Sequence, residues 1–333
     1  MPDTVLLTGI TGFIAKRIAF DLLLAGYAVT GTVRTPAREA EVRATLAANG
    51  LDAATLTRLR FLSLDLNSDA GWADAMTGVN AVIHTASPFP IAQPKDENVL
   101  IRPAVDGTLR VLKAAQAAGV QRVVLTSSME AVMHGHTGTI TEKDWSDLTA
   151  PTATAYTKSK TLAEKAAWDF VAQHPEMQLT AINPGMVLGT PMDRETGSSV
   201  GVVKRFLTGK DPMVPDVSIP MTDVADVSAA HVAALKTPAS IGQRYMVSDQ
   251  FLSMPAMTGI LKAAYPQRRI ATRIAPRFVL RLLSLFDAEI RAILPWVGWT
   301  ARLDNSKIRH ELGIAITPAK DSILATARFL DGA

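Results

Sequence analysis

Tyr156 and Lys160 are the residues of this sequence whose types and spacing most directly suggest chemistry. They stand four positions apart in the segment YTKSK, within a pattern over 155–173 that predicts a helix, so both face the same side. A free phenol has a pKa of about 10 and is largely protonated at neutral pH. A nearby ammonium favours the phenolate, and the pair could therefore relay a proton. Such a pair also arises by chance, so its meaning depends on the residues that accompany it.

Two serines end a predicted strand over 121–128, in the segment LTSS. Neighbouring side chains of a strand point to opposite faces, so we expect only one of Ser127 and Ser128 to reach a cleft. A serine hydroxyl in that place could hold a carbonyl oxygen beside Tyr156. Serine-rich strand ends are common, and the serines gain meaning only in combination with the tyrosine and lysine.

Three small residues with an even spacing of three form a second motif. Gly9, Gly12 and Ala15 follow a predicted strand over 4–8 and lead into a predicted helix over 12–24. In a dinucleotide site, one glycine permits a tight turn, another lets the pyrophosphate approach, and a third small residue lets the helix pack on the strand. The phosphates then lie on the free N–H groups of the helix start. The spacing differs from G-x-G-x-x-G, but the position after the first strand favours cofactor binding over an ordinary corner.

The end of the second predicted strand indicates which cofactor would bind. A site for NAD places an acid there, against the ribose 2′-hydroxyl, whereas this chain has Arg34, with Arg38 following. An arginine can pair with a 2′-phosphate, which an acid would repel. The sequence therefore predicts NADP(H), with a solvated loop arginine as the alternative.

Short apolar runs alternate with helical patterns through the first half of the chain. Strands are predicted over 4–8, 27–34, 59–65, 80–86, 121–128 and 178–185, and the clearest helices over 12–24, 36–48 and 155–173. This alternation predicts an α/β fold with a doubly wound parallel sheet of the Rossmann type, whose ligands bind at the carboxyl ends of the strands.

The alternation fails after residue 185. We therefore expect a dinucleotide-binding domain over 1–185, to which 222–248 returns, and a smaller, mostly helical substrate-binding lobe over 186–333.

The composition excludes several classes of protein. Among 333 residues, 48% are hydrophobic and 20% are charged, as in an ordinary globular protein, and the formal net charge is only +3. The basic residues are dispersed among acidic ones, so we expect no nucleic-acid partner. The chain has no cysteine, which excludes disulfides, thiolate metal sites and a thiol nucleophile.

The sequence further predicts a cytoplasmic protein that does not enter a membrane. Its first residues lack the basic, apolar and small-residue succession of a signal peptide. The apolar stretch 277–299 is interrupted by arginines and acids and is too broken to span a bilayer. We expect this stretch to cover a substrate cleft, with a role at a membrane surface as the alternative.

The histidines do not predict a metal site. His134 and His136 stand beside the strand that ends in the two serines, but no nearby cluster supplies further ligands, so we interpret them as residues of a substrate loop and leave their roles open. His84 is expected to be structural or near the cofactor, and His231 to be a packed helix residue. An apolar pocket, suited to an apolar or aromatic substrate, is suggested by four methionines: Met186, Met192, Met213 and Met221.

Taken in order, these motifs resemble the extended short-chain dehydrogenase/reductase family. The resemblance is carried by the Gly9-x-x-Gly12-x-x-Ala15 turn, Arg34, Asp65-Leu66, the Ser128 strand end, Tyr156-x-x-x-Lys160 and NPGMVLG. The segments TGITGFIA, TVR, PAVDGTLRVLKAA, RVVLTSS, WSDL and KSKTLAEKAAWDF are most similar to its dihydroflavonol reductase and cinnamoyl-CoA reductase branch. The similarity runs from residue 4 to about residue 250 and thins out beyond.

The resemblance implies a role for each matching residue. Tyr156 would be the general acid, Lys160 would bind the nicotinamide ribose and lower the pKa of the tyrosine, and Ser128 would polarise the carbonyl. The implied contacts to NADP(H) are Gly9, Thr11, Gly12, Phe13, Ile14, Arg34, Arg38, Asp65, Leu66, Thr85, Ala86, Ser87, Thr126, Tyr156, Lys160, Pro184, Gly185 and Val187.

Two positions depart from the pattern of this branch. Asp106 stands where asparagine is usual, in a helix expected behind the site, which puts a water relay in doubt. Glu41 stands where a second basic contact to the 2′-phosphate is expected, so Arg34 would act with Arg38 alone.

The sequence thus predicts NADPH-dependent reduction of an aldehyde or ketone to an alcohol by hydride transfer. One alternative is an NAD-dependent sugar-nucleotide epimerase or dehydratase of the same family, against which Arg34 and the segment SSMEA weigh. Another is a non-catalytic NADP-binding regulator, against which the serine, tyrosine and lysine weigh. The substrate, its stereochemistry, the physiological direction and the oligomeric state stay open.

Overall fold

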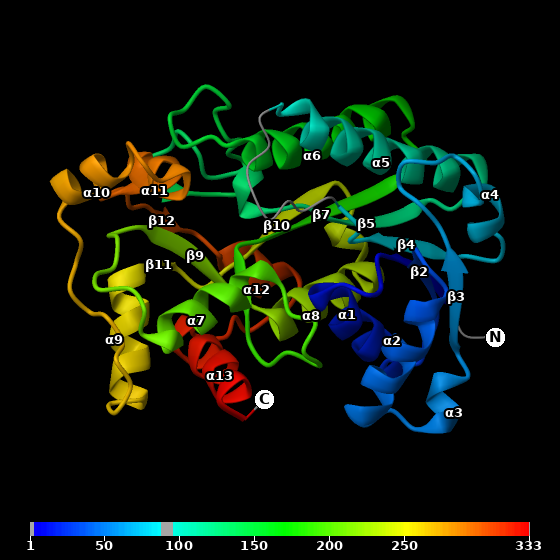
Figure 1. Ribbon diagram of the computed structural model, residues 1–333. Coiled ribbons are helices and arrows are strands. Elements are labelled where there is room, and N and C mark those ends of the chain that lie inside the picture. Colours follow the sequence, from blue (N-terminus) through cyan, green and yellow to red (C-terminus); the bar gives the residue numbers. More distant parts are fainter. Residues whose placement is uncertain (1–2, 88–95, 333) are drawn as a thin grey trace.

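A seven-stranded sheet forms the centre of the molecule in the computed structural model, which describes residues 3–87 and 96–332 (Figure 1). Its strands pair in parallel in the order β10-β7-β5-β4-β1-β2-β3, and the order reverses between β1 and β4. The predicted doubly wound α/β fold is confirmed. The strands are β1 (Thr4–Thr8), β2 (Ala28–Val33), β3 (Leu59–Ser63), β4 (Ala81–His84), β5 (Arg122–Thr126), β7 (Gln178–Pro184) and β10 (Gln243–Val247).

Helices cover both faces of this sheet (Figure 1). One face carries α1 (Phe13–Leu24), α2 (Ala37–Ala48), α3 (Ala53–Leu56), α8 (Val224–Lys236) and α12 (Ser306–Glu311). The other carries α4 (Trp72–Ala75), α5 (Asn98–Ala117) and α6 (Ala155–Gln173).

The position of β1, with helices packed on both faces of the sheet, explains why its sequence is an unbroken apolar run. Val5 and Leu7 pack in the core beneath α1, whereas Leu6 packs in the core beneath α5, and none of the three is exposed. A strand that is buried on both faces needs apolar residues at every position rather than at every second one.

A second lobe follows β7. It contains a three-stranded sheet of β8 (Met186–Leu188), β9 (Ser218–Asp223) and β11 (Phe251–Ser253), which the sequence did not predict. Its helices are α7 (Ser198–Thr208), α9 (Met254–Ala264), α10 (Arg277–Leu283), α11 (Ala288–Ile293) and α13 (Ala319–Gly332). Short elements complete the chain: β6 (Thr139–Ile140), β12 (Arg302–Leu303), η1 (Met129–Ala131), η2 (Pro238–Ser240) and η3 (Leu294–Trp296).

The chain passes between the two lobes more than once. Helix α8 packs on α1, and β10 pairs with β7 at the edge of the main sheet. Ile308 and Leu312, near the end of the chain, pack in the core beneath α1, whereas Ile323 of α13 packs in the core of the second lobe. Residues beyond 185 therefore help to build the sheet that carries the proposed chemistry.

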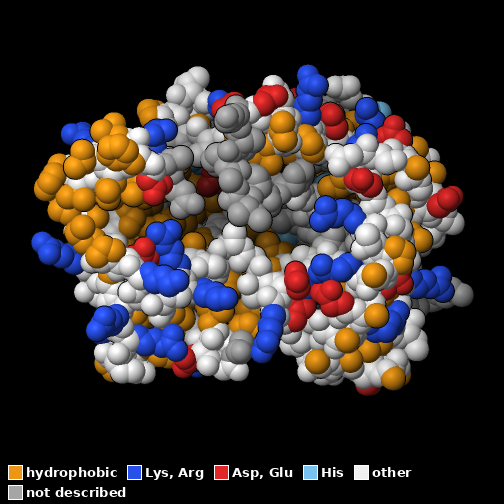
Figure 2. Space-filling model, in the orientation of Figure 1, with side chains coloured by type: hydrophobic (Ala, Val, Ile, Leu, Met, Phe, Trp, Pro, Cys, Tyr) orange, Lys and Arg blue, Asp and Glu red, His pale blue; other side chains and the backbone are white. Residues whose placement is uncertain are grey.

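The predicted cover over 277–299 forms α10, α11 and η3 rather than one helix. Figure 2 shows hydrophobic side chains gathered over α10 and α11, and Phe278 and Phe286 are 73% and 85% exposed. Of the helices in the described parts of the chain, none combines the length and apolarity needed to cross a bilayer.

Candidate active site

A cavity of about 420 Å³ opens at the carboxyl ends of β1, β4, β5 and β7. This is where a doubly wound sheet places its ligands. Thirteen of the residues predicted from the sequence line it: Gly9, Gly12, Phe13, Ile14, Thr85, Ser87, Thr126, Ser128, Tyr156, Lys160, Pro184, Gly185 and Val187. Six predicted contacts do not line this cavity: Arg34, Asp65, Leu66 and Ala86 lie just after strands, Arg38 lies in the first turn of α2, and Thr11 lies in the turn before α1.

The glycine turn fits a dinucleotide phosphate. Gly9 has a φ of +69°, a conformation that residues with a side chain rarely adopt, and a Cβ there would lie 3.0 Å from the Cβ of Ala86. Gly12 begins α1 as its N-cap without a side-chain hydrogen bond to the helix start. Backbone N–H groups therefore line this end of the cavity, where they can bind a pyrophosphate.

The two predicted arginines differ in their surroundings. Arg34 is exposed just after β2, and its guanidinium makes no ion pair within residues 3–87 and 96–332. Arg38 is 2.8 Å from a carboxylate oxygen of Glu41 and 3.6 Å from one of Glu195. Glu41 thus neutralises Arg38, and of these two arginines Arg34 is the one that has no ion pair in the described parts of the chain.

Asp106 does not stand where the sequence comparison placed it. It is exposed on α5, in a surface hollow with Asp69, Arg110 and Lys113, and it does not line the cavity. The expectation of an acid behind the site is wrong, because this residue occupies the solvent-facing side of its helix.

Tyr156 is positioned by the first turn of α6. The N-cap Thr154 accepts a hydrogen bond from the Thr157 N–H (3.2 Å), and the Thr157 hydroxyl accepts one from the Thr154 N–H (3.1 Å). This reciprocal capping fixes the start of the helix one residue before Tyr156. Lys160 lies one turn later, with Nζ 5.8 Å from the centre of the Tyr156 ring.

The pKa values of Tyr156 and Lys160 are shifted in opposite directions from their ordinary values. Burial raises the pKa of Tyr156, the Glu130 carboxylate raises it further, and a hydrogen bond with Ser128 opposes them. The net shift of the Tyr156 pKa is upward, and Lys160 is not among its causes, so the expected lowering by Lys160 stays a prediction. Burial lowers the pKa of Lys160 to about 8, although Glu164 opposes the change. A tyrosine that keeps its proton is suited to donate it.

Both Ser127 and Ser128 line the cavity, so the expectation that only one of them reaches it is wrong, but their hydroxyl groups have different partners. Ser127 donates its hydroxyl to Glu164, which is buried on α6. Ser128 instead hydrogen-bonds Tyr156 and accepts the N–H of Glu130 at 3.2 Å. The two hydroxyls are thus committed to different partners, and Ser128 is the one paired with the tyrosine.

Glu164 also accepts hydrogen bonds from three further residues. The Arg244 guanidinium of β10 approaches at 2.6 Å, the Asn183 amide of β7 at 2.8 Å and the Trp168 indole at 3.2 Å. Arg244 also lies 3.8 Å from the centre of the Trp145 ring. A buried charge needs such compensation, and this ion pair joins α6 to β10 directly beneath the serines.

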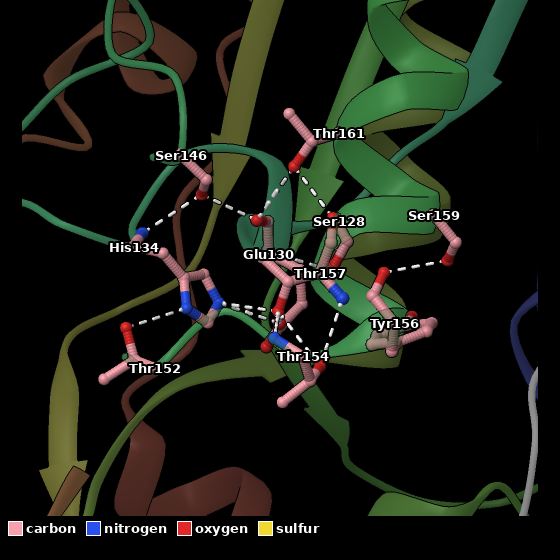
Figure 3. Close-up of polar contacts among 10 residues, drawn as sticks. All are labelled: Ser128, Glu130, His134, Ser146, Thr152, Thr154, Tyr156, Thr157, Ser159 and Thr161. Atoms are coloured by element: carbon pink, nitrogen blue, oxygen red, sulfur yellow. Dashed lines mark hydrogen bonds and ion pairs between the residues drawn. The ribbon is translucent and has the colours of Figure 1, made fainter. Parts of the chain in front are cut away.

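Glu130 is a charged cavity residue that was not predicted from the sequence. Its Oε2 accepts hydrogen bonds from the Thr157 hydroxyl (2.6 Å) and from Nε2 of His134 (2.8 Å), as Figure 3 shows. Nδ1 of His134 lies 3.1 Å from the Thr152 hydroxyl. The sequence does contain a signal for Glu130, namely an acid two positions after a strand-end serine in the segment SSMEA. In the sequence this segment argued only against a dehydratase.

The other histidines have partners in the protein. Nδ1 of His84 lies 2.8 Å from the Thr8 hydroxyl, and Nε2 of His231 lies 2.7 Å from the Thr126 hydroxyl. Nε2 of His136 lies 2.8 Å from the carbonyl oxygen of Trp145. Within residues 3–87 and 96–332, no group of three or more His, Cys, Asp or Glu residues is arranged to hold a metal ion.

A second cavity of about 280 Å³ adjoins the first and shares Tyr156 with it. Its walls are mostly apolar, with Met254, Ile293 and Trp296 supplied by the second lobe. Of the four methionines predicted to line a pocket, Met186 lines the first cavity. The other residues that line the second cavity are Glu130, Met133, Thr154, Val217, Ser218, Ile219 and Pro220.

Comparison with known proteins places the chain among reductases. The sequence profile of the NAD dependent epimerase/dehydratase family matches residues 5–248. An anthocyanidin reductase ((2S)-flavan-3-ol-forming) from Vitis vinifera is 32% identical over 81% of this chain and 83% of its own length. Cinnamoyl-CoA reductase 1 from Arabidopsis thaliana is 31% identical over 98% of this chain and 89% of its own.

A solved structure shares both the fold and the extent of the chain. The yeast methylglyoxal/isovaleraldehyde reductase Gre2, complexed with NADPH, superposes with a TM-score of 0.81 and 27% sequence identity. The match covers 99% of this chain and 98% of that one. Gre2 from Candida albicans in complex with NADPH gives the same TM-score at 26% identity, over 100% and 99% of the two chains.

The buried histidines predict a loss of stability in mild acid. Burial lowers the pKa of His231 from 6.5 to about 4, so below pH 6.5 the unfolded chain takes up a proton that the folded chain does not. From pH 7.5 to pH 5 this one group should remove roughly 2 kcal/mol of unfolding free energy. His231→Gln should reduce the loss by that amount in urea unfolding, whereas His310→Gln, at an exposed position, should not. An unchanged loss in His231→Gln would contradict the assignment.

Proposed function

Because this chain belongs to the NAD dependent epimerase/dehydratase family, we propose that it is an NADPH-dependent reductase that converts an aldehyde or a ketone to an alcohol. The observation that carries this proposal is that Ser128, Tyr156 and Lys160 line one cavity with the glycine turn. The similarity to anthocyanidin and cinnamoyl-CoA reductases, and to Gre2 structures that contain NADPH, supports it.

We assign the cofactor to the first cavity. The N–H groups of the first turn of α1, which follows Gly12, would hold its pyrophosphate, Arg34 its 2′-phosphate, and Lys160 the ribose next to the nicotinamide. When bound, NADPH supplies a hydride to the carbonyl carbon. The other proposed contacts are Thr11, Phe13, Ile14, Arg38, Asp65, Leu66, Thr85, Ala86, Ser87, Thr126, Tyr156, Pro184, Gly185 and Val187.

The chain's own residues handle the carbonyl oxygen. Ser128 donates a hydrogen bond to it, and Tyr156 donates the proton that the oxygen takes up as it gains charge. The raised pKa of Tyr156 keeps the proton on the phenol until the oxygen becomes basic. Below about pH 8 Lys160 carries a charge, and this charge stabilises the phenolate that remains.

Neither alternative explains the site as well. An epimerase that retains NAD calls for an acid after β2, where this chain has Arg34. A regulator that only binds NADP has no need of a tyrosine hydrogen-bonded to a serine beside a buried lysine. The apolar second cavity supports an apolar or aromatic substrate, and the absence of cysteine supports a reducing compartment such as the cytoplasm.

Tyr156→Phe tests the proposed proton donor. The substitution removes the hydroxyl and keeps the ring, so kcat for reduction should fall by at least about 100-fold while the NADPH dissociation constant changes little. Steady-state oxidation of NADPH with a panel of aldehydes and aromatic ketones measures the first quantity, and fluorescence titration measures the second. Tyr265→Phe, outside both cavities, serves as the control. Near-normal turnover in Tyr156→Phe would remove this residue from the mechanism.

The two serines should separate catalysis from stability. Ser128→Ala removes a donor from the carbonyl oxygen and should lower kcat by about 100-fold. Ser127→Ala takes a donor from the buried Glu164 and should lower the free energy of unfolding by about 1–3 kcal/mol. Kinetics and urea unfolding of both variants check the pair. The reverse result, with the larger kinetic loss in Ser127→Ala, would exchange their roles.

Arg34→Ala tests the cofactor preference. A charge-assisted contact to the 2′-phosphate contributes about 1.5–3 kcal/mol, so the protein should bind NADPH about 10- to 100-fold more tightly than NADH. Arg34→Ala should erase most of this margin by weakening NADPH, and added salt should reduce it. Arg38→Ala should change it less, because Glu41 and Glu195 already neutralise that arginine. Equal affinity of the unaltered protein for both cofactors would overturn the assignment.

A further inference from the structure

The Glu130 carboxylate lies on the wall of both cavities, and the proposed chemistry does not use it. It belongs to η1, the turn that follows Ser128 directly. The Ser128 hydroxyl accepts the Glu130 N–H at 3.2 Å, and the Glu130 side chain is 22% exposed. The carboxylate and the proposed carbonyl-binding hydroxyl therefore stand on one short, capped turn.

In the part of the chain that the structure describes, hydrogen-bond partners reach one of the two Glu130 carboxylate oxygens. Oε2 accepts from Thr157 at 2.6 Å and faces Nε2 of His134 at 2.8 Å, and these contacts fix the orientation of the carboxylate (Figure 3). For Oε1, residues 3–87 and 96–332 provide no hydrogen-bond partner. One acceptor oxygen is thus left for a molecule in the cavity.

The charge of Glu130 decides which groups can meet that oxygen. Burial would raise the pKa of Glu130, but the hydrogen bonds from His134 and Thr157 hold the pKa below its ordinary value. An ionised carboxylate only accepts hydrogen bonds. It attracts a donor and repels a carboxylate or a phosphate on the substrate.

The second cavity next to Glu130 is lined mostly by apolar residues. Met254, Ile293 and Trp296 line the second cavity, and the edge of the His134 ring packs on Trp296 with the ring centres 4.7 Å apart. Moving a neutral hydroxyl into such surroundings costs less than moving an ammonium ion. The donor that suits this place is therefore a hydroxyl.

We propose, resting on the reductase function above, that Glu130 recognises a hydroxyl group that the substrate carries close to its reacting carbonyl. The substrate class is then a hydroxy-substituted aldehyde or ketone with an apolar body, and oxo acids are disfavoured. Glu130 Oε1 accepts from this hydroxyl while Ser128 and Tyr156 bind the carbonyl oxygen. Contacts to the hydroxyl and to the carbonyl, made by residues of the η1 turn and of α6, would fix which end of the substrate enters the first cavity.

Binding to the NADP⁺-loaded protein tests this proposal apart from turnover, since the oxidised cofactor has no hydride to give to a ketone. Calorimetric titration compares 2-hydroxyacetophenone, 2-methoxyacetophenone, which keeps the oxygen and loses the donor, and benzoylformate, an oxo acid. The hydroxy ketone should bind about 10- to 100-fold more tightly than the methoxy ketone, and benzoylformate should bind most weakly. Equal binding of the hydroxy and methoxy ketones would overturn the proposal.

Two variants connect the preference to Glu130. Glu130→Leu should abolish it, and Glu130→Gln, which keeps an acceptor without the charge, should reduce it and strengthen benzoylformate binding. Glu176→Gln changes an exposed carboxylate outside both cavities and should leave the preference intact. Thermal unfolding checks that each variant folds. If Glu130→Leu does not fold, Glu130→Gln alone decides the test. If folded Glu130→Gln kept the full affinity ratio between the hydroxy and methoxy ketones, and its affinity for benzoylformate did not change, the recognition would belong to another residue.

A parallel assay keeps the two proposals distinguishable. The same ketones are offered to the protein with NADPH, and its oxidation is followed. Equal reduction and equal binding of the hydroxy and methoxy ketones would contradict the role of Glu130 and leave the reductase function standing. A hydroxyl preference in binding without reduction of any ketone would contradict the function and leave the recognition site standing.

Discussion

The buried ion pair between Glu164 and Arg244 is the constraint on which the geometry of the site depends. A carboxylate without exposure costs several kcal/mol unless it is paired and fully hydrogen-bonded, and here Arg244, Asn183, Trp168 and Ser127 supply the donors. Because Ser127 is one of these donors, its hydroxyl is turned away from the tyrosine, and the next residue, with the opposite orientation, pairs with Tyr156. The charge on one helix therefore decides which serine hydroxyl pairs with the tyrosine.

The same ion pair makes the proposed chemistry depend on the return of the chain. Arg244 belongs to β10, a strand that joins the sheet only after the chain has passed through much of the second lobe. Its guanidinium also donates to the carbonyl oxygens of residues 142 and 144, which precede α6. The parts of the chain that form the substrate cavity and those that position the serine and the tyrosine are thus connected by one buried cation. Removing either partner would leave the other charge buried and unpaired, which should lower the free energy of unfolding by about 3–5 kcal/mol.

Local signals in the sequence sufficed for the elements that carry the main motif. The apolar run of β1 and the helical pattern of α6 gave their observed limits, and the glycines predicted the turn between β1 and α1. The choice between Ser127 and Ser128 could not be made locally, because it depends on Arg244, which is more than a hundred residues away. Glu130 was missed for a related reason, since an acid near a strand end is ordinary until its cavity is visible. The three-stranded sheet was missed because β8 and β11 have three residues each, too few to show a period.

The central claim is that this cavity reduces a carbonyl group with hydride from NADPH, and isotope transfer tests it most directly. The protein would be incubated with aldehydes and ketones and with NADPH carrying deuterium at C4, each of the two C4 stereoisomers in turn, and the alcohol would be examined by mass spectrometry and NMR. The account predicts an alcohol with one deuterium on the former carbonyl carbon, from one of the two stereoisomers only. Alcohol without deuterium, or no alcohol from any carbonyl compound while NADPH binds, would contradict it.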